Sequence, residues 1–314
     1  MFSIKKLFLF FIIILILIFS LGAESNIDRQ KEMVKFFGLN DKEEKQVDLG
    51  RIKTKKSKKD EKKDQKYLAE LKGMEGISAA SWKLFKQEAI NKEQLTLEIS
   101  YMGLTAGELV LKVTPEEIVA DKKVIKASAA LKSVSVYKLF FEANDNLESY
   151  ILKDSFIPLK HTLVQNEKGK KLREIQLFDH DKLTGYFFSD KIEEKKEAKK
   201  GTTGQLPKLF QDSLSSIIFL TGLPLKKGDH YKIPIVDKAR AKLVSIDVTA
   251  GEDMEIAGKK VKTVKLNASG LLSVIKKQRQ VTFWFSNDEF HRLVKLEAEL
   301  NVGMITGKLV RHSK

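Results

Sequence analysis

Apolar and polar residues alternate along much of the chain beyond residue 93. In residues 94–101, Leu95, Leu97, Ile99 and Tyr101 fall on one side, and the polar residues between them fall on the other. A period of two places successive side chains on opposite faces of a strand, so this pattern predicts strands with one buried face. The same alternation recurs in residues 107–113, 123–131, 239–249, 280–285 and 292–300.

Short turn sequences separate several of these predicted strands. Clusters of Asn, Asp, Gly, Ser or charged residues occur at positions 144–146, 167–169, 179–181, 257–258 and 286–288. Short connections indicate antiparallel pairing, because parallel strands need crossover helices. We therefore expect about ten to twelve strands in an antiparallel sheet. A sheet of this size must curl, so the predicted fold is mainly β, with one large curved sheet forming a half-barrel or barrel-like structure.

One segment departs from the alternation. Its apolar residues follow the i, i+3, i+4 spacing of a helix, and Gly222 and Pro224 follow it. We predict one packed α-helix around residues 206–221 that plugs the concave side of the sheet. The residues predicted to face the concave side or a ligand are Tyr101, Leu214, Ile217, Ile218, Phe283 and Trp284. The charged residues 190–204 are expected to form a surface loop or a frayed helix.

The first residues have the composition of a secretory signal peptide. A basic start is followed by the apolar run Leu7–Phe19 and by small residues at Ser20 and Gly22. This pattern predicts a signal peptide over residues 1–22 or 1–23. The alternative is a retained anchor helix, because the apolar run approaches the shortest length that spans a bilayer. In either case the basic start predicts that the rest of the chain is exported to the periplasm or cell envelope.

The chain between the apolar run and the β domain is highly charged. A short amphipathic helix is predicted to end at Gly38, and residues 78–91 have the spacing of a second helix that docks on the domain. Between them, Arg51–Lys66 is strongly basic and almost devoid of apolar residues, so we predict a mobile tether. Residues 24–92 are therefore expected to be a largely flexible arm with short helices, before an antiparallel β domain at 93–314.

Composition narrows the class of protein further. The chain has 57 Lys and Arg against 42 Asp and Glu, a formal net charge of +15, and no cysteine. The absence of cysteine excludes disulfides, thiolate metal sites, thiol enzymes and a thioether-linked lipid anchor. A basic chain can bind nucleic acid, but an exported protein rarely meets it, so no nucleic-acid partner is expected. Most of the excess charge lies in the β domain, which favours anionic envelope surfaces as partners.

Catalytic motifs are not apparent in the sequence. It contains no G-x-S-x-G nucleophile elbow and no H-E-x-x-H zinc motif. The cluster Asp179-His180-Asp181 has metal-ligand residue types, but neighbours on an extended segment face opposite ways, so we interpret it as a turn. We predict no catalytic, cofactor-binding or metal-ligating residue and expect a protein that is not an enzyme.

Several short motifs follow one another in a characteristic order. They are Tyr101-Met102-Gly103 with Gly107, Gln211-Asp212 through Leu214-Ser215, Leu223-Pro224-Leu225 with Gly228, and Trp284, Ser286 and Asp288 before Gly303. Over about residues 93–310 this order resembles the exported bacterial family called domain of unknown function 3108. The resemblance implies an envelope protein with a large curved antiparallel sheet, and it implies no reaction or cofactor.

Two functions from different classes fit these observations. The first is a non-catalytic binding module that holds an apolar or lipid-like ligand in the curved sheet, because one helix cannot cover the apolar face of so many strands. The alternative is a structural or assembly factor of the envelope that binds a protein or an anionic glycan through its basic surface. In the first case a filled core would leave no room for a ligand.

Overall fold

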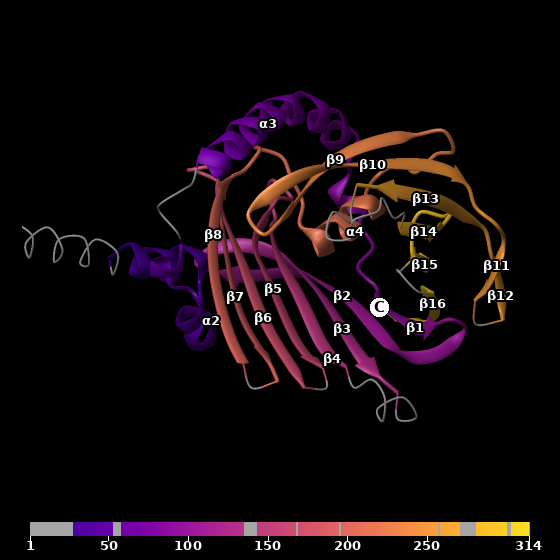
Figure 1. The fold of residues 1–314 in the computed structure, drawn as a ribbon. Coiled ribbons are helices and arrows are strands. Elements are labelled where there is room, and N and C mark those ends of the chain that lie inside the picture. Colours follow the sequence, from indigo (N-terminus) through magenta and orange to yellow (C-terminus); the bar gives the residue numbers. More distant parts are fainter. Residues whose placement is uncertain are drawn as a thin grey trace, which may run out of the picture.

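A single antiparallel sheet dominates the protein (Figure 1). The computed structural model describes residues 28–52, 58–134, 143–167, 169–194, 196–256, 258–270, 281–299 and 303–313. Within these ranges fourteen strands pair in the order β8-β7-β6-β5-β4-β3-β2-β1-β16-β15-β14-β13-β10-β9, and β11 and β12 form a separate hairpin. The mainly β prediction is confirmed, although the strand number exceeds the ten to twelve expected. The signal peptide predicted over residues 1–22 or 1–23 lies outside the described residues.

The strands and helices have the following bounds. The strands are β1 Gln94–Tyr101, β2 Leu104–Val119, β3 Lys122–Ser133, β4 Asn144–Leu152, β5 Pro158–Glu167, β6 Lys170–Asp179, β7 Thr184–Glu193, β8 Lys196–Gln205, β9 His230–Asp237, β10 Arg240–Ala250, β11 Met254–Ile256, β12 Lys259–Val261, β13 Thr263–Ser269, β14 Val281–Ser286, β15 Leu293–Glu299 and β16 Met304–Ser313. The helices are one over residues 28–37, α2 Asp41–Gln46, η1 Leu49–Arg51, α3 Lys58–Leu84, η2 Gln87–Ala89 and α4 Ser213–Thr221.

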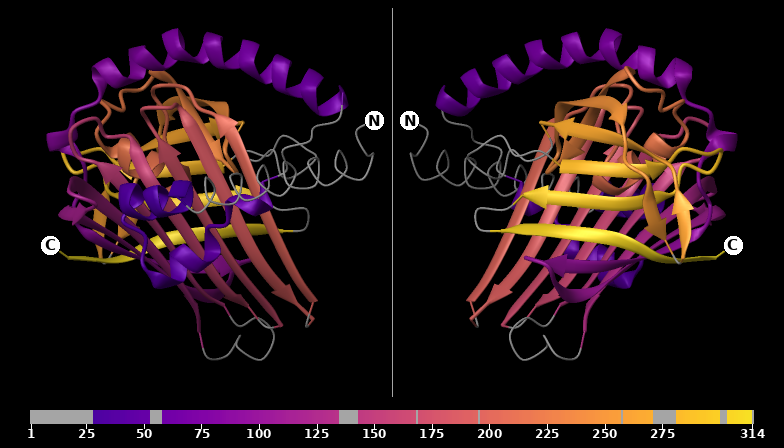
Figure 2. Two further views of the ribbon diagram at one scale, coloured as in Figure 1. Left: turned by 90° about the vertical axis from the view of Figure 1, so that its left-hand side faces the viewer. Right: turned by 90° about the vertical axis from the view of Figure 1, so that its right-hand side faces the viewer.

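The sheet curls around α4, so that one face is concave and the other faces outward. In Figure 2 the strands near the C-terminus run across those of the N-terminal half, which gives the sheet a half-barrel shape. The first hairpin shows how the turns fit this curvature. Gly103 adopts φ +82°, a conformation that favours glycine, and the register shifts between Ile99 and Ser100. This hairpin therefore combines a tight turn with a bulge.

Helix α4 is shorter than the sequence pattern predicts. A helix was expected around residues 206–221, but the structure has only Ser213–Thr221. Asp212 begins the helix as its N-cap, accepting the backbone N–H groups of Leu214 and Ser215. Just before it, Gln211 pairs with β9, donating its N–H to the carbonyl of Pro234. The apolar residues upstream are thus held in extended backbone, and their helical spacing is coincidental.

Helix α3 corrects the prediction of a flexible tether. Residues 58–66, expected to be mobile, form the first turns of a helix of 27 residues, and residues 53–57 lie outside the described part. Lys, Glu and Gln are good helix formers, and this part of α3 needs no core to be helical. Tyr67, Leu71 and Met74 then anchor α3 on the sheet. In the described part of the chain, no helix combines the length and apolar character needed to span a membrane.

The predicted first helix and α2 pack on the outer face of the sheet. As expected, the helix over 28–37 ends at Gly38, and it buries Phe37 against Leu177 and Phe188. The side chain of Glu43 on α2 accepts a hydrogen bond from the Lys160 ammonium, at 2.9 Å. Residues 28–52 and 58–92 are therefore part of the folded structure, and not a separate arm with short helices.

The charged segment 190–204 forms most of a β-hairpin. A surface loop or frayed helix was predicted there, but β7 continues to Glu193, and β8 spans Lys196–Gln205 at the edge of the sheet. The lysines of β8 are exposed. Charged side chains on an edge strand hinder pairing with another chain, so the unusual composition is explained by the position of β8.

The two edges of the sheet meet through side chains. Among described residues, no ladder joins β8 to β9. At the seam, the Tyr67 hydroxyl of α3 donates to the carbonyl of Gln205 at 2.7 Å and accepts the N–H of Ala241 at 2.8 Å. A side chain at Gly204 would collide with the carbonyl of Ala239, so the two edges approach closely. Tyr67 therefore links the end of β8 to the start of β10.

Replacing Tyr67 with Phe tests this seam. We expect Tyr67→Phe to lower the free energy of unfolding by about 1–3 kcal/mol, because the buried N–H of Ala241 loses its acceptor. The matched control is Tyr186→Phe, since the Tyr186 hydroxyl has no hydrogen-bond partner among the described residues and its loss should change little. Urea unfolding measures both, and equal effects would contradict the proposed seam.

Candidate functional site

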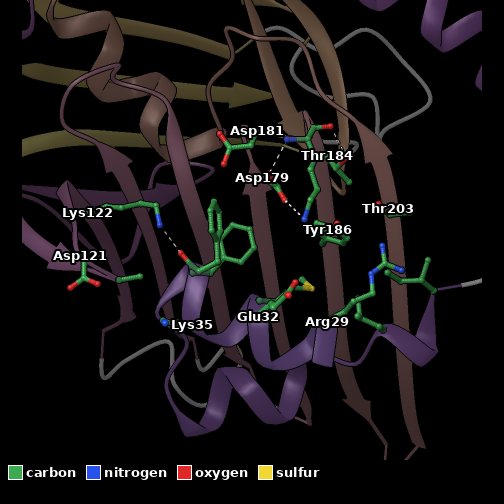
Figure 3. A pocket seen from close by; sticks show the side chains of 17 residues that line it. Arg29, Glu32, Lys35, Asp121, Lys122, Asp179, Asp181, Thr184, Tyr186 and Thr203 are labelled. Atoms are coloured by element: carbon green, nitrogen blue, oxygen red, sulfur yellow. Dashed lines mark hydrogen bonds and ion pairs between the residues drawn. The ribbon is translucent and has the colours of Figure 1, made fainter. Parts of the chain in front are cut away.

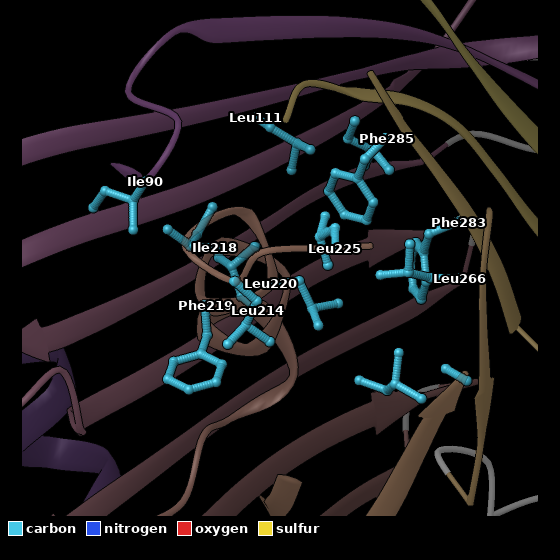
Figure 4. Packing of buried hydrophobic residues seen from close by; sticks show 14 of the residues in the cluster. Ile90, Leu111, Leu214, Ile218, Phe219, Leu220, Leu225, Leu266, Phe283 and Phe285 are labelled. Atoms are coloured by element: carbon cyan, nitrogen blue, oxygen red, sulfur yellow. The ribbon is translucent and has the colours of Figure 1, made fainter. Parts of the chain in front are cut away.

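The upper part of the concave side is filled. Helix α4 packs there against side chains from both halves of the sheet, including Leu111, Leu266 and Phe285 (Figure 4). From α3 and the residues after it, Trp82 and Phe85 also reach this core, and Phe85 stacks on Phe219 with ring centroids 4.3 Å apart. These contacts fill the space around the buried side of α4, whereas Ser213 is exposed and Ile217 is half-buried.

The lower part of the concave side carries apolar side chains that α4 covers only in part. Strand pairing places Leu109 opposite Leu131 and Leu147 opposite Leu163, on the same face as the core. These side chains remain half-buried. We define the open concave face as the half-buried apolar residues Ile99, Leu109, Leu131, Leu147, Leu163, Ile217, Val281 and Leu296.

Small residues alternate with the larger side chains of this face. Gly107, Ala129, Gly307 and Ala298 point to the same side of the sheet. At Gly107 a Cβ atom would meet the carbonyl of Lys132 at 2.5 Å, and at Gly307 it would meet Ile99 and Leu296 at 3.0 Å. Neighbouring atoms therefore already occupy the space beside both glycines.

A row of polar residues borders the open concave face. Register places Ser149 of β4, His161 of β5 and Gln176 of β6 side by side, two residues along the strands from Leu147 and Leu163. We call these three residues the polar row. All three are buried, with exposures of 0%, 4% and 4%. Two residues of strand span about 7 Å, so the apolar and polar surfaces are adjacent.

The start of α4 contacts the polar row. The Ser149 hydroxyl donates to the carboxylate of Asp212, and the Ser213 hydroxyl lies 3.3 Å from His161 Nε2. On the other side, Gln176 Nε2 lies 3.5 Å from His161 Nδ1. Ser213 is exposed, so this hydrogen-bonded chain runs from the buried sheet to the accessible side of α4.

Carboxylates give the neighbourhood of the polar row a negative character. Glu174 lies on the same face of β6 as Gln176, and burial raises the pKa of its carboxyl above the ordinary value. Lys238 opposes this shift, and Asp237 adds to it. Together, the open concave face can contact a ligand through apolar side chains, and the adjacent polar row can offer it hydrogen bonds.

The sequence matches a protein family whose function is unknown. The profile of the family described as "Protein of unknown function (DUF3108)" matches residues 96–310, more than half of the chain. The chain belongs to the DUF3108 family. No curated protein matches it. A solved structure, titled "Crystal Structure of Beta-barrel-like Protein of Domain of Unknown Function DUF1849 from Brucella abortus", is similar, with 11% identity and a TM-score of 0.40 over 71% of this chain and 98% of that chain.

The DUF3108 domain places the predicted concave residues in different surroundings. Leu214, Ile218 and Phe283 lie in the filled core, and Ile217 is half-buried on the open concave face. Tyr101 is 39% exposed at the end of β1, beyond the open concave face. The prediction thus found the concave side but not which part of it remains uncovered.

Trp284 lies on the opposite face, so its assignment to the concave side is wrong. Adjacent residues of a strand face opposite ways, and Phe283 and Phe285 occupy the concave side. Trp284 instead pairs with Lys265 and Lys295, whose ammonium groups lie 5.2 and 4.4 Å from its ring centroid. The 4% exposure of Trp284 reflects its place in a buried cluster that also contains Met254 and Ile256 of β11.

The sequence analysis did not predict the polar row of the DUF3108 domain. Its members come from three strands, so no local spacing connects them. One signal was available, since His161 alternates in phase with Leu163 and is a polar residue at an inward-facing position. The turn predicted at 179–181 is confirmed, because Asp179 accepts the backbone N–H of Lys182.

A hollow of about 820 Å³ lies on the outer face of the DUF3108 domain, between the helix over 28–37 and the β6–β7 turn (Figure 3). Its lining includes four cationic and four anionic side chains. The Lys122 ammonium donates to the carbonyl of Phe36 at 2.9 Å, and Lys182 pairs with Asp179 at 3.5 Å. Because its charges balance, this hollow favours no charged ligand class.

The raised pKa of Glu174 predicts a pH dependence of stability. The folded state binds the proton more tightly than the unfolded state, so this residue's contribution to stability falls as pH rises through the raised pKa. We expect Glu174→Gln to remove this loss and to flatten the urea midpoint between about pH 4 and about pH 8. Glu98→Gln, at an exposed outward position, is the control. An unchanged pH slope in Glu174→Gln would contradict the assignment.

Proposed function

We propose that the DUF3108 domain is a non-catalytic binding protein for an apolar, lipid-like ligand that lies on the open concave face. The observation that carries this proposal is the set of half-buried apolar side chains that strands far apart in the sequence turn toward the concave side. Leu109 pairs with Leu131, and Leu147 pairs with Leu163 in the adjacent row of the register. Contiguous apolar surface of this kind is typical of ligand or partner sites.

The lengths of the elements explain why this face is uncovered. The nine residues of α4 span about 13 Å, at 1.5 Å per residue. The twelve residues of β3 span about 40 Å, at 3.3 Å per residue. Helix α4 is therefore too short to lie along more than about a third of β3 in any direction, and a bound chain would occupy part of the remainder.

The energy available from this contact is sufficient for binding. Burial of each methylene group contributes about 0.8 kcal/mol, so about ten methylenes correspond to about 8 kcal/mol before the entropy of association is subtracted. The concave shape and the adjacent polar row supply the mixture of apolar and polar lining that is usual in ligand sites. The apolar run at the start of the sequence supports an exported protein that works in the cell envelope.

Two substitutions on one strand test the proposed site. Leu109→Lys places a charge on the open concave face, whereas Val110→Lys places the same charge on the outward face of β2. Both original side chains are half-buried. We expect Leu109→Lys to weaken binding of a fluorescent apolar probe such as N-phenylnaphthylamine by about 10-fold or more, since the ligand would have to desolvate the charge. Val110→Lys should bind like the wild type.

Titration of the probe into the wild type and both variants, with circular dichroism to confirm folding, measures the difference. Equal affinity in the two variants would contradict binding at this face. Absence of probe and fatty-chain binding in the wild type would refute the proposed function itself.

A further inference from the structure

The polar row adds a hydrogen-bonding surface to the apolar surface of the proposed site. It borders the apolar residues of the open concave face, in register with Leu147 and Leu163. A ligand that lies along the apolar residues would therefore bring one end to the polar row. The chemistry of that row decides which polar end fits.

One member of the polar row has an unused hydrogen-bond acceptor. Gln176 is 4% exposed, and its Oε1 atom has no hydrogen-bond partner within the described structure. Its side chain lies on the concave side, beside His161. An unpaired buried carbonyl oxygen costs about 1–3 kcal/mol. Because the oxygen itself is buried, a ligand donor removes that cost when the Gln176 side chain turns toward the concave space.

Ser213 provides the accessible contact at the same place. It is exposed, and its hydroxyl interacts with His161 Nε2 at 3.3 Å. The tautomer of His161 decides whether this hydroxyl donates to the ring or accepts from it. In either state a hydroxyl retains a further hydrogen-bonding position, which can face the concave space.

The charges nearby disfavour an anionic end. The carboxylate of Asp212 is fully buried and accepts hydrogen bonds from two backbone N–H groups and from Ser149. Glu174 adds a second carboxyl on the same side of the sheet, and Lys238 is a cation that acts on it. A ligand carboxylate would meet two carboxyl groups against one ammonium and has no proton to offer Gln176, whereas a hydroxyl donates and accepts.

We infer that the polar row and Ser213 form a headgroup subsite, and that the ligand is an uncharged amphiphile whose hydroxyl binds at Ser213 and at the Gln176 amide turned toward the concave space, while its aliphatic chain lies on the open concave face. This inference rests on the proposed function. It goes further by naming the ligand class, a long-chain alcohol or a hydroxyl-bearing lipid.

Three ligands with the same chain test the headgroup. Dodecanol has a hydroxyl donor, dodecyl methyl ether has none, and dodecanoate carries a negative charge. Displacement of N-phenylnaphthylamine gives their relative affinities for the wild-type protein. We expect dodecanol to bind about 2- to 10-fold more tightly than either of the others, the range that one hydrogen bond supplies.

Two variants link this preference to the named residues. Ser213→Ala, at an exposed position, and Gln176→Met, which removes the unpaired oxygen, should each bring dodecanol binding down to the level of the ether. Gln165→Met is the control. Gln165 is a half-buried glutamine whose partner is Asp145 rather than a member of the polar row, so the preference should persist.

The outcomes separate the two proposals. Equal binding of all three ligands, tighter binding of dodecanoate, or an unchanged preference in both Ser213→Ala and Gln176→Met would overturn the headgroup subsite while the apolar site stands. If none of the three displaces the probe from the wild type, the apolar site and the headgroup subsite both fail.

Discussion

The structure depends on one constraint, the need to cover the apolar side of a fourteen-stranded sheet. Strict alternation gives each strand one apolar face, and a flat sheet would leave that face in water. Curling brings the two halves of the sheet together around α4, which buries Leu214 and Ile218 between them. Because α4 has only nine residues, it covers the upper part of the concave side and leaves the open concave face.

The remaining helices stabilise this shape from outside, except at the end of α3, where Trp82 enters the filled core. Helix α3 lies across the seam, where Tyr67 joins the backbone of β8 to that of β10. The helix over residues 28–37 and α2 pack on the outer face of β5 to β7 through Phe37 and the Lys160–Glu43 ion pair. None of these elements reaches the open concave face, so the segments that complete the fold leave the candidate site uncovered.

The sequence predicts the sheet because a period of two is a local property, and the family motifs follow it in order. Prediction from the sequence fails where the secondary structure of a segment depends on its tertiary contacts. The charged segment of α3 forms a helix that docks on the sheet through Tyr67. The lysine-rich β8 is a strand because it pairs at the edge of the sheet. Strict alternation would have placed Trp284 outside. The polar row required the pairing of three strands, which no spacing in one sequence reveals, although His161 at an inward position was a sign of it.

The most direct measurement of the central claim is a crystal structure of the protein with a dodecanol that carries bromine at the end of its chain. Anomalous scattering would locate the bromine, and the electron density would locate the hydroxyl. The account predicts the bromine beside Leu109 and Leu131, and the hydroxyl at Ser213. Bromine in the hollow next to the helix over residues 28–37, or at no defined place on the concave side, would contradict it.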